Sequence, residues 1–95
     1  MKYEFTGKTK VVDGVTLRRI RAATAFGIVI KGEVGGWIES EHNLSQVYDT
    51  AWVYGNAWVY GNAVVCDNAR VYGNALAGRQ YRAFADIAAM SFQEG

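Results

Sequence analysis

The chain has 95 residues, with ten Lys and Arg, nine Asp and Glu, one His, one Cys and no Pro, a length that suits one domain. One Cys and one His exclude a disulfide framework and any metal site that needs several of them from one chain. The formal net charge of +1 argues against a general nucleic-acid binder, which carries a strong basic excess. No segment is apolar for long enough to be a signal peptide or a membrane span, so we expect a cytoplasmic protein without membrane contact.

The N-terminal segment, 1–23, predicts a β-hairpin. Two β-type runs, 8–12 and 15–21, flank Asp13-Gly14, and Asp-Gly between such runs is among the strongest hairpin signals. Residues 1–33 carry seven basic and three acidic side chains, whereas residues 34–95 carry three basic and six acidic. Arg18, Arg19 and Arg21 are therefore candidates to meet an anionic partner. The alternative is that they form a solvated face of a protein whose total charge is balanced.

Residues 24–46 predict an irregular connection between the hairpin and the rest of the chain. Residues 26–30 are apolar and suit a further strand. Three glycines then interrupt the pattern before Trp37. The polar stretch 39–46 suits a loop, with Leu44 as the side chain that anchors it to the core.

A six-residue repeat runs from Val47 to Leu76, through VYDTAW, VYGNAW, VYGNAV, VCDNAR and VYGNAL. Gly is unfavourable inside helices, and Val, Tyr and Trp favour strands, so each unit is a short strand followed by a corner. Strand alternation places Val inside and its aromatic neighbours outside, and the small Ala fits inside beside the corner. The inward positions are Val47, Val53, Val59, Val65 and Val71, with Ala51, Ala57, Ala63, Ala69 and Ala75.

These units resemble the hexapeptide repeat of left-handed parallel β-helices, in which three units make one triangular coil. The resemblance implies an all-β fold in a single domain, 1–95: a hairpin cap (1–23), an irregular first coil (24–46), a regular array of about two coils (47–82) and a C-terminal cap (83–95), which is either a degenerate unit or a short helix. Residues at the same position of successive coils should then stack. The expected pairs are Val47 with Val65, Val53 with Val71, Val59 with Ala77, Asn56 with Asn74 and Ala57 with Ala75, and outside Trp52 with Arg70, Tyr54 with Tyr72 and Tyr48 with Cys66.

The aromatic side chains of the array are the strongest candidates for a contact surface. Contiguous apolar patches mark interfaces, and Tyr and Trp are enriched at binding hot spots. We expect them to form a homo-oligomer, a trimer or a dimer. The alternatives are packing against the chain's own N-terminal segment, or binding of a protein partner or a small ligand between subunits. The candidates are Tyr48, Trp52, Tyr54, Trp58, Tyr60 and Tyr72.

Catalysis has one weak candidate. Known enzymes of the hexapeptide family include acyltransferases that use acyl-CoA and a His general base, and the only His here is His42. Cys66 takes the place of an outward Tyr, and the following Asp67 disfavours a reactive thiolate. We therefore expect no catalytic residue, no metal and no cofactor.

The stretch GEVGGWIESEHNLS (32–45) followed by VYGNA units also resembles small phage and prophage proteins built from such repeats. We predict a non-enzymatic, oligomeric binding protein of phage type, acting in the cytoplasm of the host cell. One role that suits this setting is to block or sequester a component of bacterial defence. The alternatives are an acyltransferase-like enzyme with His42 as base and a purely structural repeat module.

Overall fold

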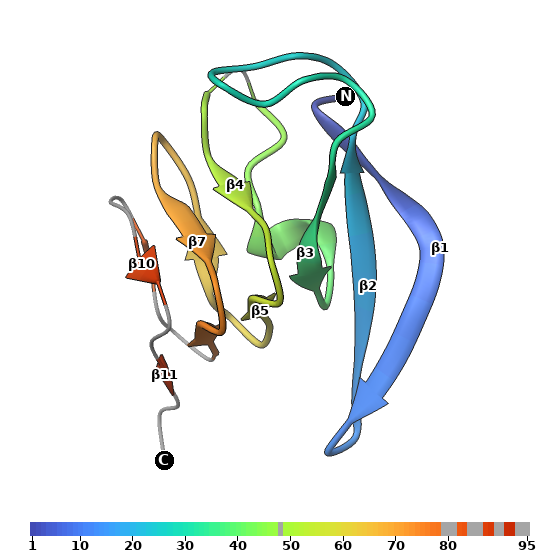
Figure 1. Ribbon diagram of the computed structural model, residues 1–95. Coiled ribbons are helices and arrows are strands. Elements are labelled where there is room, and N and C mark those ends of the chain that lie inside the picture. Colours follow the sequence, from blue (N-terminus) through green and yellow to red (C-terminus); the bar gives the residue numbers. More distant parts are fainter. Residues whose placement is uncertain (48, 79–81, 84–86, 89–90, 93–95) are drawn as a thin grey trace.

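The computed structural model describes residues 1–47, 49–78, 82–83, 87–88 and 91–92, the last three pairs by their backbone only. Within these residues the regular secondary structure consists of β-strands and a single turn of 3-10 helix, η1 (Glu41–Asn43), which confirms the predicted all-β class (Figure 1). The strands are β1 (Tyr3–Val12), β2 (Val15–Ala22), β3 (Val34–Ile38), β4 (Trp52–Val53), β5 (Trp58–Val59), β6 (Val64–Val65), β7 (Arg70–Tyr72), β8 (Leu76–Ala77), β9 (Arg82–Ala83), β10 (Ile87–Ala88) and β11 (Ser91–Phe92).

The predicted hairpin is confirmed. β1 and β2 pair antiparallel around a turn in which Asp13 (φ 50°) and Gly14 (φ 81°) both have left-handed backbone angles, which matches the twist of the flanking strands. The register shifts between Phe5 and Thr9, where Gly7 has φ 96°. β2 also pairs antiparallel with β3, so the hairpin continues directly into the rest of the sheet (Figure 1).

The short strands of the array enter three sheets in rotation. β4, β7 and β10 form one sheet, and β6 and β9 form another. β5, β8 and β11 extend the hairpin sheet to six strands, in the order β1-β2-β3-β5-β8-β11. All pairs within the array are parallel. The predicted pairs of residues 18 apart lie side by side in register for Trp52 with Arg70, Val53 with Val71, and Val59 with Ala77.

Four corners of the array have a residue with positive φ. Gly55, Gly61 and Gly73 have φ between 62° and 67°, and Asp67 has φ 60° in the unit VCDNAR, where Asp takes the place of the glycine. Corners of successive coils lie in close contact, because a Cβ on Gly55 would lie 3.0 Å from the Gly73 nitrogen. A side chain at that corner would be strained both by its backbone angle and by its neighbour.

The core of the array is made from the repeated Val and Ala positions. Their side chains are fully buried, and backbone amides of one coil donate to carbonyl groups of the next, as from Trp52 to Ala69 (3.1 Å) and from Trp58 to Ala75 (3.0 Å). The buried residues of the repeat are Ala51, Val53, Ala57, Val59, Ala63, Val65, Ala69, Val71, Ala75 and Ala77.

The start of the array was predicted wrongly. Val47 is 67% exposed, and the residue that bridges Val65 in parallel is Leu44, which is fully buried. η1 turns the chain just before Leu44, so this side chain reaches the core earlier in the sequence than the repeat predicts. The prediction that Leu44 anchors its loop is confirmed.

The predicted strand at 26–30 is also wrong. Only one bridge, between Phe26 and Val29, is present there. Their two mutual backbone hydrogen bonds, of 3.0 and 2.8 Å, close a tight turn in which Gly27 has φ 52°. The segment therefore folds back on itself and lies against the array, where a Cβ on Gly27 would touch the Thr50 side chain.

In the predicted C-terminal cap, 83–95, the described residues include strands rather than a helix. β10 pairs with β7 and β11 pairs with β8, both in parallel. Ile87 lies opposite Val71 and Ser91 lies opposite Leu76, so these partners are closer in sequence than those of the regular coils. The rest of this predicted cap lies outside the described residues.

Candidate binding surface

The outer face of the six-stranded sheet carries a second set of packed side chains. Arg19 lies opposite Trp37 and Trp37 opposite Trp58 in register, so their side chains share one face. Lys10 lies opposite Leu17 on the same face. Leu17 and Trp37 are 1% and 6% exposed, although neither belongs to the Val and Ala core. Both faces of the sheet therefore carry buried side chains.

Two cations lie over the indole rings of this face. Lys10 Nζ is 4.3 Å from the ring centre of Trp37 and 4.9 Å from that of Trp58. The Arg19 guanidinium carbon is 5.1 Å from the Trp37 ring centre, and Arg19 Nε donates to the Gly35 carbonyl oxygen at 2.8 Å. Each cation–π contact contributes about 0.5–1 kcal/mol when partly exposed. We call Lys10, Leu17, Arg19, Trp37 and Trp58 the cation–aromatic cluster.

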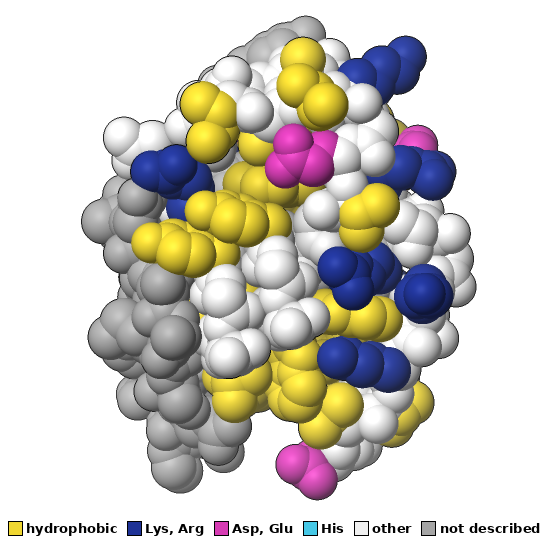
Figure 2. Space-filling model, viewed as in Figure 1, with side chains coloured by type: hydrophobic (Ala, Val, Ile, Leu, Met, Phe, Trp, Pro, Cys, Tyr) yellow, Lys and Arg dark blue, Asp and Glu magenta, His cyan; other side chains and the backbone are white. Residues whose placement is uncertain are grey.

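Lys10 and Arg19, the two cations of the cation–aromatic cluster, have no acidic partner in the described part of the chain. The ion pairs there are Lys2 with Asp49 and Arg21 with Glu4, so no carboxylate lies within 4.0 Å of Lys10 or Arg19. Figure 2 shows Lys and Arg side chains gathered over β1 and β2, with hydrophobic side chains beside them. The positive charge on this face therefore favours binding of an anionic group.

The three predicted arginines do not form one site. Arg19 belongs to the cation–aromatic cluster. Arg18 faces the opposite side of the sheet, where it donates to the Glu39 carbonyl oxygen and lies 5.9 Å from the Phe5 ring centre. Arg21 is bound by Glu4, whose Oε2 accepts two hydrogen bonds of 2.9 and 2.7 Å. A single anion on the outer face could therefore contact Arg19, but it could not contact all three arginines together.

Trp52 was predicted to be part of an exposed contact surface, and this is wrong, because its side chain is covered and only 1% exposed. The turn at 26–29 covers it, with the Phe26 ring packed edge-on at 5.2 Å between ring centres. The indole Nε1 of Trp52 is buried without a hydrogen-bond partner in the described structure. This aromatic residue therefore packs within the chain, although the turn that covers it belongs to the irregular connection, 24–46, and not to the N-terminal segment, 1–23.

Four other predicted contact residues, Tyr54, Trp58, Tyr60 and Tyr72, are half-buried. We call them the array aromatics. The rings of Tyr54 and Tyr72 stack at 5.0 Å with an interplanar angle of 7°, as the predicted stacking of coils requires. The Tyr60 ring lies against Gly78, where a Cβ would lie 2.5 Å from its Cε2 atom. Tyr48 lies outside the described residues, so its predicted place in the surface and its stacking on Cys66 stay predictions.

His42 lies in η1 and is exposed. In the described structure its imidazole has no carboxylate partner to orient it, as a general base needs. Cys66 is a half-buried free thiol, and the described residues include no group of three or more His, Cys, Asp or Glu able to hold a metal ion. His42 lines an open depression of about 610 Å³ with Arg18, Glu39, Ser40, Gly61 and Asn62.

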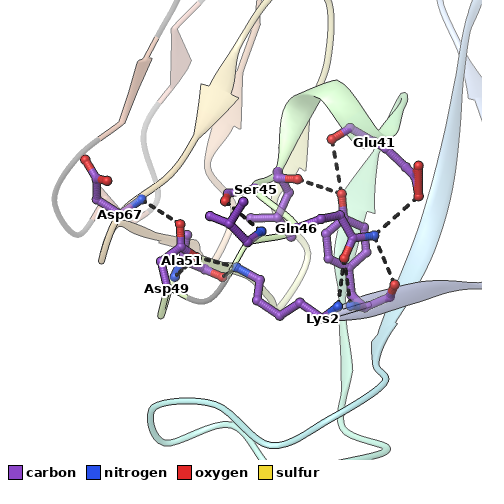
Figure 3. Close-up of polar contacts among 10 residues, drawn as sticks. Lys2, Glu41, Ser45, Gln46, Asp49, Ala51 and Asp67 are labelled. Carbon is purple, nitrogen blue, oxygen red and sulfur yellow. Dashed lines mark hydrogen bonds and ion pairs between the residues drawn. The ribbon is translucent and has the colours of Figure 1, made fainter.

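A polar network ties the N-terminus to the array (Figure 3). The ammonium of Lys2 is buried, 2.6 Å from Asp49 Oδ1 and 2.9 Å from the Ala51 carbonyl oxygen. Burial lowers the pKa of Lys2 by more than Asp49 raises it. Burial also disfavours the Asp49 carboxylate, but hydrogen bonds from Lys2 and Ser45 and the Lys2 charge outweigh it and lower the Asp49 pKa. These contacts join the N-terminal end of the chain to the start of the array.

Lys10 and Trp37 were missed as site residues. The run 8–12 predicted one strand of the hairpin, but nothing local showed which strands beyond the hairpin would lie beside Lys10. Trp37 pairs with Trp58, whereas the period of the coils would place Gly55 beside it. The periodicity therefore could not connect the two indoles.

No protein-family model matches the chain, and no curated protein matches it either. In the part of the chain that the structure describes, no helix is long and apolar enough to cross a membrane.

Proposed function

We propose that this protein is a non-catalytic binding protein, which associates with copies of itself through the array aromatics and binds an acidic partner at the cation–aromatic cluster. One observation carries the proposal. Lys10 and Arg19 are held over the rings of Trp37 and Trp58, and no carboxylate in the described structure neutralises them. A carboxylate at this place gains a charge-assisted contact, and the half-buried Trp58 supplies apolar area beside it.

We propose further that the array is a short left-handed parallel β-helix of the hexapeptide type, with the hairpin as its N-terminal cap. Two findings support this. The short strands rotate through three sheets, and each strand of the regular coils pairs with the strand three units further along the chain. The hand of the coil follows from the resemblance of the repeat. A β-helix of so few coils has little core of its own, so covering its outer aromatics stabilises it.

Self-association is the use that best fits the array aromatics. Tyr54 and Tyr72 end one face of the array. Trp58 begins the next face after the corner at 55–57, and Tyr60 ends it. Rigid aromatic rings bind at a low cost in conformational entropy, which makes them frequent hot spots. A dimer or a trimer covers these rings, and a small ligand or a protein segment fits between subunits.

The biological setting in the proposal comes from the resemblance to phage and prophage proteins. A small binding protein with an acidic partner, acting in the cytoplasm of the host, suits the role of blocking or sequestering a component of bacterial defence. The chemistry of the partner, an acidic surface, is the part that the residues themselves support.

Native mass spectrometry tests the self-association, because it reports assembly size and any retained ligand together. We expect a dimer or a trimer, and a smaller assembly for the double variant Trp58→Ala with Tyr60→Ala. The variant Val47→Ala is the matched control, since Val47 is exposed and apolar but lies outside the array aromatics. Binding of poly-L-glutamate at low salt tests the acidic partner. If the wild-type protein is a monomer at tens of micromolar, self-association is refuted. If it also does not bind poly-L-glutamate, the acidic partner is refuted as well.

A further inference from the structure

We propose that the free edge of β1, at residues 9–12, binds an extended acidic polypeptide segment as an added β-strand. The proposal rests on the acidic partner of the proposed function and specifies how that partner is held. It does not depend on self-association of the array.

β1 is the last strand at one side of the six-stranded sheet and pairs only with β2 (Figure 1). In an antiparallel edge strand, the backbone N–H and C=O groups of alternate residues point away from the sheet. Such an edge is a template for another strand. Within residues 9–12 of β1, the groups of alternate residues are therefore available to an added strand.

The N-terminal part of this edge is already closed by the chain itself. The Gln46 side chain accepts from the backbone amides of Lys2 and Tyr3, at 2.9 and 3.1 Å, and donates to the Tyr3 carbonyl oxygen at 3.1 Å. It thus replaces a neighbouring strand at that point. Gly7 then bends β1, and the Lys8 amide donates to Thr6 Oγ1 at 3.1 Å. Beyond Lys8, the described structure gives the backbone of β1 no partner other than β2.

The side chains along the open part specify the chemistry of the added strand. Lys8 is exposed and has no acidic partner in the described structure. Lys10 belongs to the cation–aromatic cluster, and Val11, on the other face, is 69% exposed. An added strand therefore gains from a Glu or Asp beside Lys10 and from a β-branched residue beside Val11. A segment that alternates acidic and β-branched residues fits both faces.

A second copy of this chain fits the edge poorly. Antiparallel pairing of two β1 strands would bring Lys8 and Lys10 of one copy close to the same residues of the other. Like charges opposite each other destabilise a strand pair. The basic side chains that gather over β1 and β2 in Figure 2 strengthen this repulsion. The occupant is therefore an acidic segment of a different protein.

The test uses a fluorescein-labelled heptapeptide that alternates Glu and Val, measured by fluorescence anisotropy with the full chain. A second peptide carries N-methyl groups on alternate backbone amides along one edge, which removes hydrogen bonds and keeps the charge. We expect the methylated peptide to bind at least 10-fold more weakly. Lys8→Glu should also weaken binding of the first peptide about 10-fold. Lys31→Glu makes the same change of charge at an exposed position outside β1 and should change binding less than 2-fold.

Hydrogen exchange gives a second readout that does not depend on variants. Saturation with the first peptide should slow exchange of backbone amides within residues 9–12. If both peptides bind equally, charge alone holds them and the strand proposal falls, while the acidic partner of the proposed function stands. If neither binds, both fall. If the chain forms a dimer whose β1 amides become protected without peptide, the occupant is a second copy, and the proposal is overturned.

Discussion

Asn43 offers the sharpest test of how the irregular segment is joined to the array. Its side chain is fully buried and makes four hydrogen bonds, all to the backbone. Oδ1 accepts from the amides of Glu39 and Ser40, at 3.1 and 2.9 Å. Nδ2 donates to the carbonyl oxygens of Gly61 and Ala63, at 3.2 and 2.8 Å. One side chain thus connects the turn before η1 to a corner of the array.

Asn43→Ala removes all four bonds and leaves a cavity. An intramolecular hydrogen bond contributes about 1 kcal/mol net, and a buried polar group left without a partner costs about 1–3 kcal/mol. Water will reach some of the freed groups, because the turn lies near the surface. We therefore expect the free energy of unfolding to fall by about 2–4 kcal/mol, a large part of the roughly 5–10 kcal/mol expected for a small domain.

Urea unfolding followed by tryptophan fluorescence measures this loss. Asn56→Ala is the matched control, since Asn56 lies at an exposed corner of the array and should change the free energy of unfolding by less than about 0.5 kcal/mol. A loss below about 1 kcal/mol for Asn43→Ala, with an unchanged urea dependence, would refute the reasoning, because the four bonds would then contribute no more than one ordinary contact.

Three further predictions concern packing and pH. Gly35→Ala should lower the free energy of unfolding by about 1–3 kcal/mol, because a Cβ there would lie 2.6 Å from the Val53 carbonyl oxygen; an unchanged thermal midpoint would contradict this. Trp52→Ala should cost about 3–5 kcal/mol in urea unfolding and Trp58→Ala clearly less, since only Trp52 is fully buried; equal losses would refute the difference. The Asp49 pKa is lowered from its usual 3.8, so the unfolded state binds more protons between the folded pKa and 3.8, and stability falls as the pH drops through that window. Asp49→Asn should flatten this part of the stability curve, and an unaltered curve would count against it.

The regular part of the fold could be predicted from the sequence because its causes are local. Asp13-Gly14 suits the left-handed angles that a tight hairpin turn needs. In the array, each unit repeats a strand triplet and a corner, so alternation alone decides that Val53 and Ala57 point inward. Which units pair is what the resemblance to hexapeptide repeats implied, with three units to a coil, and Val53 pairs with Val71 as expected.

The candidate site was decided by contacts between segments far apart in the chain. Alternation correctly placed Trp52 on the outer side of its strand, but the turn at 26–29 then covered it. Leu44 replaced Val47 in the core because η1 turned the chain earlier than the repeat implied. Lys10 lies over the Trp58 ring only because β2 and β3 join the hairpin to the array in one sheet. A local pattern determines the direction of a side chain from its own strand, whereas only the tertiary packing of distant segments decides what lies against it.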